Sequence, residues 1–460
     1  MTRKIFPAAA APSTPHGAPP LWQQLGAVAQ GLQMILAGQS GNQALAEVPA
    51  RLRPGVQALL FQVLRQLGRA QALRAQLAPK APPPKVNALL CTALALAWDA
   101  EQAPYEPFTL VNQAVEAAKR LGMERQAGFL NGCLRRFLRE RDALVAATAQ
   151  DIQACWNHPR WWIERLQRDH PQDWQQILQA NNAHAPMSLR VNQQKTTPGA
   201  YVQLLAQQGM TASVFGDSGV QLQQAQPVQA LPGFAEGHVS VQDGAAQLAA
   251  DLLLRGLDCT QPLQLLDACA APGGKTAHLL EYAGAQSAVQ VVALEVDAER
   301  SLRIHDTLQR VGVAARAKVM VADAGQPQQW WAAANGGQQF DAILLDAPCT
   351  ASGIVRRHPD VRWLRRATDV EQLAAIQSQM LDALWPLLKP GGRLLYCTCS
   401  VFKAEGDAQV QAFLARNKQA QLGAAPGHLI PGNATQIAGL RDNAAGDHDG
   451  FFYALLHKKS

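Results

Sequence analysis

The chain contains 460 residues, of which 48% are hydrophobic and only 17% are charged. This length predicts two or three domains with sizeable cores, and the sequence has no uninterrupted apolar segment long enough to span a membrane. The net charge of +6 suits a nucleic-acid partner without demonstrating one. Composition therefore excludes a membrane-spanning protein and favours a globular one with several domains.

Residues 1–20 begin with a short basic sequence and continue with alanines and prolines. Because no sustained hydrophobic stretch follows the basic start, we expect a disordered tail rather than a secretory signal peptide. The eight cysteines are widely scattered, and their spacing matches no zinc-finger pattern. We therefore expect a cytoplasmic protein with reduced thiols and no bound metal.

Residues 21–157 are expected to be all-helical. Apolar residues recur at helical spacing from Val56 to Leu67 and again from Phe129 to Leu138. The proline-rich stretch 78–84 separates two such helices. Four or more packed helices of this kind are enough for an independent bundle.

Residues 158–240 differ in character, with a tryptophan-rich start and then short strand-like and helix-like runs. Strands are expected at 188–192, 212–215 and 220–223, with a helix at 198–210. This order predicts a linker and a small α+β module. The next strand, 239–243, and the helix after it are expected to lead into the last domain.

Residues 241–460 alternate regularly between strands and helices or loops. The strand-like runs are 263–266, 289–294, 318–321, 342–345, 393–396 and 451–456. Such alternation predicts an α/β fold with a parallel, doubly wound, Rossmann-like sheet. In such a sheet, ligands bind at the carboxyl ends of the strands, near the point where the strand order reverses.

The turn after the first of these strands has the composition of a nucleoside site. It runs from Asp267 through Pro272, Gly273 and Gly274 to Lys275, and a helix is expected to follow. Glycines let the backbone approach a ligand, and the helix N-terminus offers free amides. Both the Gly-x-x-x-x-Gly-Lys-Ser/Thr phosphate loop and the full Gly-x-Gly-x-x-Gly motif are missing. A nucleoside with little phosphate therefore fits best, and S-adenosylmethionine is the commonest such ligand.

Acidic residues follow the next two strands. Glu295 is placed to accept hydrogen bonds from ribose hydroxyls, with Asp297 as the competing choice, and Asp323 is placed to meet an adenine amino group. Acids at strand ends are also common as helix caps. Their coincidence with the glycine turn favours the cofactor interpretation.

Two cysteines follow two later strands, Cys349 after a proline and Cys399 between a threonine and a serine. If these strands are neighbours, about 5 Å apart, Asp346 and both cysteines converge beside the cofactor. A thiolate that adds to C6 of a pyrimidine makes C5 nucleophilic enough to accept a methyl group from a sulfonium, and a second acid/base group then helps the C5 proton leave. The alternative is that these cysteines are small buried hydrophobic residues, which we accept for Cys397.

The segment between the two cysteines is a basic loop that carries Arg356, Arg357, His358 and Arg362, with Trp363 beside them. These arginines next to the proposed pocket suit a loop that holds RNA phosphates. For any single arginine, a solvated basic loop explains the residue equally well.

At these motifs the chain resembles the RNA 5-cytosine methyltransferases of the Nop2/Sun group. The matching segments cover the last half of the chain: 241–243, 267–276, 346–349, 352–360, 398–400 and 449–452. In that family the Thr-Cys-Ser cysteine is the nucleophile and the Pro-Cys cysteine assists product release, which implies these roles for Cys399 and Cys349. The resemblance implies cofactor contacts by Cys269, Ala270, Ala271, Pro272, Gly273, Gly274, Lys275, Glu295, Asp323 and Asp346.

The resemblance extends upstream. Segments 111–119 and 128–132 look like the NusB-type helical RNA-binding domain of this family, and 186–192 looks like its middle module. The resemblance therefore implies a cytoplasmic, S-adenosylmethionine-dependent enzyme, expected to be a monomer. It would methylate C5 of a cytosine in 16S ribosomal RNA, either free or in an early small-subunit particle.

Three alternatives stay open on the sequence. The enzyme could act on another RNA such as transfer RNA, although the helical domain argues against this. A DNA cytosine methylase would use Cys349, not Cys399, as its nucleophile. A non-catalytic RNA-binding assembly or antitermination factor would keep only a vestigial cofactor fold.

Overall fold

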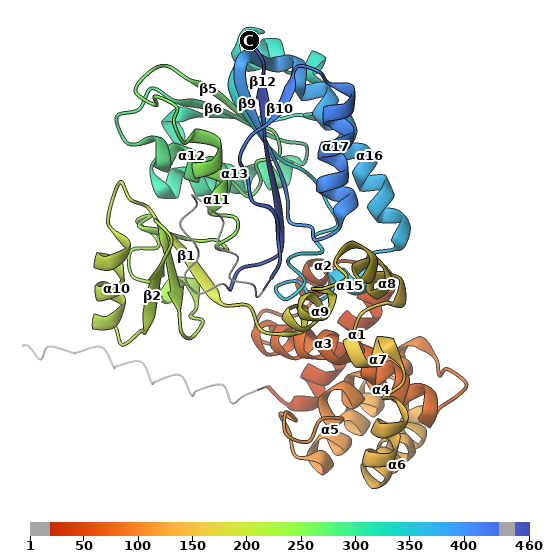
Figure 1. Cartoon of the computed structure of the whole chain (residues 1–460). Helices are drawn as coiled ribbons and strands as arrows, with labels where there is room; N and C mark the ends of the chain where they lie inside the picture. Colours follow the sequence, from red (N-terminus) through yellow and green to blue (C-terminus); the bar gives the residue numbers. More distant parts are fainter. Residues whose placement is uncertain (1–18, 432–446) are drawn as a thin grey trace, which may run out of the picture. The chain divides into compact units, whose positions relative to one another are not determined.

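A computed structural model describes residues 19–431 and 447–460, and all but the last two residues of the expected tail lie outside these ranges. The chain divides into two compact units, 1–155 and 156–460 (Figure 1). The division falls two residues before the expected one at 157. Within the described ranges, no helix has both the length and the apolar character needed to cross a bilayer.

The first unit is helical, as the sequence predicted. Helix α4 is buried along nearly its whole length and contacts α1, α3, α5 and α6. Prolines occupy the first turns of α3 and α4, where the missing N–H has no helical partner to lose. The elements are α1 (Leu21–Leu36), α2 (Gly41–Ala46), α3 (Arg53–Leu77), α4 (Pro84–Ala97), α5 (Pro107–Arg120), α6 (Glu124–Ala147) and α7 (Ile152–Trp156), the last of which crosses the division.

The second unit begins with two helices and a small α+β module. Its antiparallel sheet has the order β2-β3-β1-β4, and apolar residues of β1, β3 and α10 form one core. Strand β4 pairs with β1 and so belongs to this small sheet, not to the domain that follows it. The elements are α8 (Arg160–Asp169), α9 (Trp174–Asn182), β1 (Met187–Val191), α10 (Pro198–Gln207), β2 (Ala212–Phe215), β3 (Gly219–Leu222) and β4 (Val239–Val241).

The main sheet has the order β10-β12-β9-β8-β5-β6-β7, and β11 also pairs with β12. The predicted parallel arrangement is confirmed for β5 to β9, whereas β12 lies antiparallel between β9 and β10. The strands are β5 (Gln264–Asp267), β6 (Gln290–Glu295), β7 (Ala317–Val321), β8 (Phe340–Asp346), β9 (Leu388–Thr398), β10 (Ala420–Leu422), β11 (Gly427–Leu429) and β12 (Phe451–Lys458).

Helices cover both faces of this sheet (Figure 1). Successive residues of β5 alternate between two cores: Leu265 packs with residues of α11, α12 and α13, whereas Leu266 packs with residues of α14, α16 and α17. Burial on both faces explains why the parallel strands are almost continuously apolar. The helices are α11 (Leu248–Leu254), α12 (Gly274–Ala283), α13 (Ala298–Val311), α14 (Trp331–Asn335), α15 (Val361–Leu364), α16 (Ala367–Leu384) and α17 (Asp407–Arg416).

The strand order reverses at β5. The chain passes from β5 to β6 and β7 on one side, and then returns to β8 and β9 on the other. The five parallel strands all end at one edge, where Asp267, Glu295, Val321, Asp346 and Thr398 are their last residues. A crevice for a ligand is expected at this edge, on either side of β5.

Candidate functional site

The turn after β5 is held close to the neighbouring strand and helix. The Ala270 N–H donates to the Leu294 carbonyl of β6 at 2.8 Å, and Gly273 adopts a left-handed conformation with φ of 96° immediately before α12. A Cβ atom at Gly273 would lie 3.1 Å from Ile304 Cα of α13. Both the backbone angle and the close approach therefore favour glycine at this position.

A cavity of about 680 Å³ lies at this edge of the sheet. Its walls come from the β5 turn, the ends of β6, β7 and β8, helix α16 and the end of β9. Of the predicted site residues it is lined by Cys269, Ala271, Glu295, Asp323, Asp346, Cys349 and Cys399. The other predicted turn residues, Ala270, Pro272, Gly273, Gly274 and Lys275, are not among its lining residues.

The lining resolves the choice between two acids near the end of β6. Glu295 lines the cavity, is 5% exposed and accepts a hydrogen bond from the Asp297 N–H at 3.1 Å. Asp297 instead caps α13, where its carboxylate accepts from the N–H groups of Glu299 and Arg300 at 2.8 and 3.0 Å. Of the two, Glu295 is therefore the acid placed to meet a ligand.

Asp323 follows β7 and also lines the cavity. One of its oxygens accepts from the Gly325 N–H at 2.9 Å, and the other accepts from Gln326 Nε2 at 2.8 Å. A carboxylate offers about four acceptor positions, so both Asp323 and Glu295 retain capacity for ligand hydroxyl or amino groups. The cavity volume and this acceptor-rich wall fit a nucleoside such as S-adenosylmethionine.

The two cysteines meet in the cavity wall. Strands β8 and β9 are direct parallel neighbours, with Leu345 opposite Tyr396 and Asp346 opposite Cys397. This pairing brings Cys349 Sγ and Cys399 Sγ to 3.4 Å from each other. Cys397 lies on the other strand face and is fully buried, as expected. The two cysteines therefore converge as predicted, because strands β8 and β9 are neighbours.

The two sulfurs of this pair have charged and polar neighbours. The hydrogen bond between the two thiols and burial together raise the pKa of the Cys349 thiol well above its ordinary value. Nearby, Lys275 Nζ binds Asp346 at 2.6 Å. Burial disfavours the Lys275 charge, but the attraction of Asp346 outweighs this effect and raises the pKa of the ammonium. A fixed cation and a thiol that holds its proton tightly therefore lie at this end of the cavity.

The expected RNA-contacting arginines are placed differently from the prediction. Arg356 is 3% exposed and pairs with Asp449 and Asp447, and Arg362 is 0% exposed and donates to the carbonyls of Asn157 and Asn181. Their donors are directed into the protein, so the assignment of Arg356 and Arg362 to RNA phosphates is wrong.

The third arginine of the loop, Arg357, also points inward. Its side chain is 25% exposed and bridges Asp449 and Asp243, at 2.5 and 2.8 Å. Asp449 precedes β12 and Asp243 follows β4, so this arginine joins three segments that are far apart in the sequence. The basic loop is therefore fixed by ion pairs, and its arginines hold the wall of the site in place.

Sequence reasoning missed one wall of the cavity. Ile376, Gln379 and Met380 of α16 line it, and Ile376 is 43% exposed. These residues carry no motif, because they lie on one face of an ordinary amphipathic helix. Only the position of α16 against the sheet reveals them.

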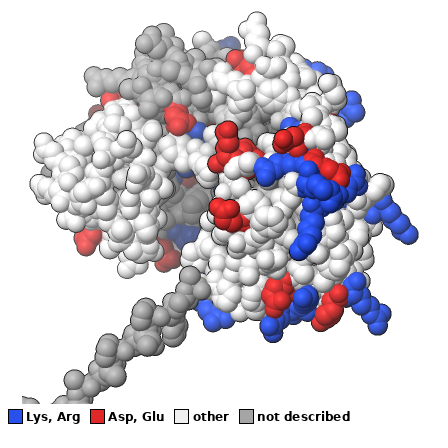
Figure 2. All heavy atoms as spheres, turned by 90° about the horizontal axis from the view of Figure 1, so that it is seen from below, with Lys and Arg blue, Asp and Glu red and all other residues white. Residues whose placement is uncertain are grey.

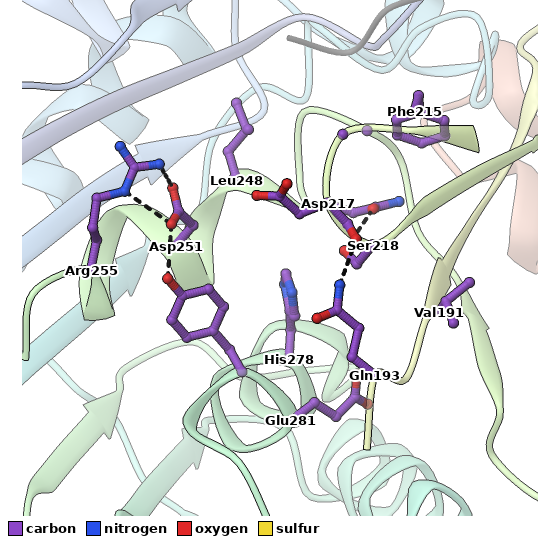
Figure 3. A pocket seen from close by; sticks show the side chains of 14 residues that line it. Val191, Gln193, Phe215, Asp217, Ser218, Leu248, Asp251, Arg255, His278 and Glu281 are labelled. Atoms are coloured by element: carbon purple, nitrogen blue, oxygen red, sulfur yellow. Dashed lines mark hydrogen bonds and ion pairs between the residues drawn. The ribbon is translucent and has the colours of Figure 1, made fainter. Parts of the chain in front are cut away.

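A second cavity, of about 370 Å³, lies between the small module and the flanks of α11 and α12 (Figure 3). Its charged groups are bound to each other. Asp251 accepts from Arg255 and from the Tyr282 hydroxyl, and Glu281 forms a buried ion pair with Arg190 at 2.9 Å. His278 faces the same cavity, and burial lowers the pKa of its imidazole well below the ordinary value.

Family models match three consecutive parts of the chain. Residues 256–457 match "16S rRNA methyltransferase RsmB/F", residues 158–229 match the ferredoxin-like domain of the RsmF/B-like methyltransferases, and residues 25–139 match the NusB family. The third match corresponds to the helical unit and the first to the main sheet with its cavity. Along the chain, the NusB match comes first, the ferredoxin-like match second and the methyltransferase match last, which is the domain order that the resemblance implied.

Curated relatives match almost the full length. Ribosomal RNA small subunit methyltransferase B of Vibrio cholerae is 40% identical over 93% of this chain and 95% of its own. The protein of the same name from Escherichia coli strain UMN026 is 39% identical over 93% and 96%. Among solved structures, "Crystal Structure of PH0851" has a TM-score of 0.72 at 24% identity, covering 95% and 99% of the two chains. At that identity the structural match supports the fold alone.

Proposed function

We propose, since this chain belongs to the 16S rRNA methyltransferase RsmB/F family, that it methylates C5 of a cytosine in 16S ribosomal RNA with S-adenosylmethionine as donor. The observation that carries the proposal is the pair of sulfurs, 3.4 Å apart, in the wall of a cavity that also contains Glu295 and Asp323. Nucleoside acceptors and a nucleophile thus face one space.

Cys399 is the proposed nucleophile. Its thiolate Sγ forms a bond to C6 of the cytosine, and the electron pair of the C5–C6 double bond moves to C5. When bound, S-adenosylmethionine would supply the methyl group to C5 from its sulfonium, and the sulfur would keep the electron pair of the broken bond as a neutral thioether. The C5 proton then leaves, the double bond reforms, and the C6–Sγ bond breaks with its electron pair returning to Cys399. A target base within a helix must first be turned out of its stack to reach the sulfur.

Cys349 is proposed to assist product release. It touches Cys399, so it lies beside the C6–Sγ bond that must break. Burial and the hydrogen bond with Cys399 raise the pKa of its thiol, so Cys349 must lose its own proton before it can receive the one from C5.

The cofactor is proposed to lie along the carboxyl ends of β5, β6 and β7. Glu295 would accept from its ribose hydroxyls and Asp323 from its adenine amino group. Asp346, fixed by Lys275, borders both the cofactor space and the cysteines, so it can also touch the target base. The turn from Cys269 to Lys275 sets the shape of this space through its backbone.

Most of the RNA binding is proposed to come from the helical unit. Helix α6 carries the exposed side chains of Arg125, Arg135, Arg136 and Arg139, with Phe129 41% exposed among them. Arg136 and Arg139 pair with Glu140 at the surface, and such pairs contribute little, so phosphates can replace the carboxylate. In the view from below, Lys and Arg side chains gather on one side of the face (Figure 2).

Bisulfite sequencing of ribosomal RNA tests the proposal. Cells that lack this gene should lose protection at one cytosine of 16S RNA, and the wild-type gene should restore it while a Cys399→Ala gene should not. Loss of a signal in transfer RNA instead would favour the transfer RNA alternative. If the Cys399→Ala gene restored the protection, Cys399 could not be the nucleophile and the proposed mechanism would be wrong. We place the reaction in the cytoplasm and expect the enzyme to be a monomer.

A further inference from the structure

One buried carboxylate lies directly behind the two cysteines. Glu405 ends a short 3-10 turn, Lys403–Glu405, and is 0% exposed. It belongs to none of the motifs that identified the site. Four donors surround it: Thr350 N–H at 2.9 Å and Gln377 Nε2 at 3.1 Å on one oxygen, and the hydroxyls of Thr350 and Ser400, at 2.5 and 2.6 Å, on the other.

The donors that matter most are the residues that follow the two cysteines. Thr350 comes directly after Cys349 and Ser400 directly after Cys399, and both hydroxyls bind the same oxygen of Glu405. The two cysteines end different strands, β8 and β9, and lie 50 residues apart in the chain. This carboxylate bridges the two residues that follow them, whose hydroxyls also lie 3.4 Å from each other.

Secondary contacts fix the bridge itself. Gln377 of α16 also donates to the Pro348 carbonyl at 2.9 Å, and the Tyr396 hydroxyl donates to the Glu405 carbonyl at 2.7 Å. Ser400 also contacts the Ser352 hydroxyl at 2.8 Å. A carboxylate held on all sides in this way has little freedom to move, so it can fix the groups bound to it.

We propose that Glu405 is a positioning residue for the methyl transfer, which holds the loops of Cys349 and Cys399 together so that the two sulfurs stay in contact beside the target base. The role of Glu405 in catalysis rests on the proposed function. Whether Glu405 keeps the two sulfurs close can be tested by disulfide trapping, without any turnover.

The charge of Glu405 has a second effect on the same pair. After the hydrogen bond with Cys399, burial and the charge of Cys399, the negative charge of Glu405 also raises the pKa of the Cys349 thiol. Removal of that charge should therefore let Cys349 ionise at lower pH.

Disulfide trapping tests the positioning. Diamide takes two electrons and two protons from a pair of thiols and leaves a disulfide, and the Cys349–Cys399 product can be quantified by peptide mass spectrometry. In Glu405→Gln, the amide oxygen can accept on one side only and the NH2 group then faces two donors on the other side, so the loops separate. We expect trapping to slow by about tenfold or more, and methyl transfer to lose about 100-fold in kcat with KM for S-adenosylmethionine unchanged.

The matched control is Asp407→Asn. It also removes one negative charge, but Asp407 lies two residues after Glu405 and its side chain is 47% exposed. It should trap and methylate like the wild type. In Glu405→Gln, alkylation of Cys349 by iodoacetamide should also reach its half-maximal rate at lower pH than in the wild type or the control.

Two variants with smaller changes keep the test decisive if Glu405→Gln does not fold. Thr350→Val and Ser400→Ala each remove one hydroxyl arm and should each slow trapping, by less than the glutamine variant would. Trapping at the wild-type rate in folded Glu405→Gln, or in both smaller variants, overturns the proposal. Failure of the proposed function shows itself differently, as full methylation by Cys399→Ala, and leaves the trapping result intact.

Discussion

Two cavities of the second unit differ in the groups that reach their walls. In the cavity of Figure 3, Asp251, Arg255 and Tyr282 are bound to one another, and Glu281 is paired with Arg190. In the cavity at the strand ends, Glu295 is paired with Arg300 at 3.3 Å and Asp346 with Lys275 at 2.6 Å, but two sulfurs also reach the wall, beside acceptor oxygens of Glu295 and Asp323.

The positions of the cavities explain this difference. The cavity of Figure 3 lies along the flanks of α11 and α12, where two parts of the unit pack together and their charges neutralise each other. The other lies where parallel strands end, so the side chains there come from loops whose backbone is already fixed by the sheet. Location at the strand ends, not the polarity of the lining, therefore indicates a reactive site.

The largest effect is expected from Cys399→Ala, which removes the proposed nucleophile. Methyl transfer to a 16S RNA transcript, measured with radioactive S-adenosylmethionine, should fall by about 10⁴-fold or more, since the sulfur proposed to form the bond to C6 is gone. Cofactor binding should persist, because Glu295 and Asp323 are untouched. Substantial residual activity would show that the cavity does its chemistry through another residue.

Cys349→Ala should stop the reaction at a later point. The bond from Cys399 to C6 can still form, but release is impaired, so a covalent protein–RNA complex should accumulate and migrate slowly in a denaturing gel. Turnover should drop by about 100-fold. In the double variant with Cys399→Ala the complex should disappear. A complex that forms in Cys399→Ala alone would assign the nucleophile to Cys349.

Substitutions of the two acids should weaken the cofactor selectively. Glu295→Gln and Asp323→Asn each remove charge-assisted hydrogen bonds, so calorimetry should show a Kd for S-adenosylmethionine raised by about 10- to 100-fold. Asp297→Asn is the matched control, because Asp297 caps α13 and does not line the cavity. It should cost about 1 kcal/mol of stability at most and leave the affinity unchanged. Equal affinity losses in all three variants would contradict the choice of Glu295 as ribose ligand.

The sequence was sufficient for features that depend on local pattern. The strands, the turn at Gly273 and the acids at strand ends follow from periodicity and residue type, and the convergence of Cys349 and Cys399 required only that β8 and β9 be neighbours. The order of strands in the main sheet is set by long-range packing, so the antiparallel place of β12 between β9 and β10 could not be predicted.

The predicted RNA contacts of the arginine loop were wrong for the same physical reason, because long-range packing decides what these arginines bind. A basic loop beside a pocket suggests RNA, but Arg356 and Arg357 bind Asp449, which lies more than 90 residues away in the chain. Glu405 was missed because a lone acid after an unremarked turn carries no signal until its four donors are brought together. Partners of charged residues are a property of the fold, which local sequence does not contain.

The cavity of Figure 3 should be recognisable by its pH dependence. Burial, and then the charge of Arg190, lower the pKa of His278, so the folded state prefers the neutral imidazole. A depressed pKa gives stability that is present above the unfolded value of about 6.5 and is lost as pH falls below it. Urea unfolding at pH 7.5 and 5.5 should therefore show a smaller acid-induced loss in His278→Gln than in the wild type, by up to about 1.4 kcal/mol per pH unit. An identical loss in both proteins would mean that His278 is protonated without cost.

The smallest effect should come from Asp251→Asn, which breaks the charge pairing in that same cavity. Arg255 is half exposed, so the ion pair is screened by solvent and its loss should cost less than about 1 kcal/mol in urea unfolding. Methyl transfer and cofactor affinity should be unchanged, because the pair satisfies two groups of the fold and leaves no capacity for a ligand. A clear loss of RNA methylation at unchanged stability would show that the helix-flank cavity takes part in the reaction, and location at the strand ends would then fail as a guide to function.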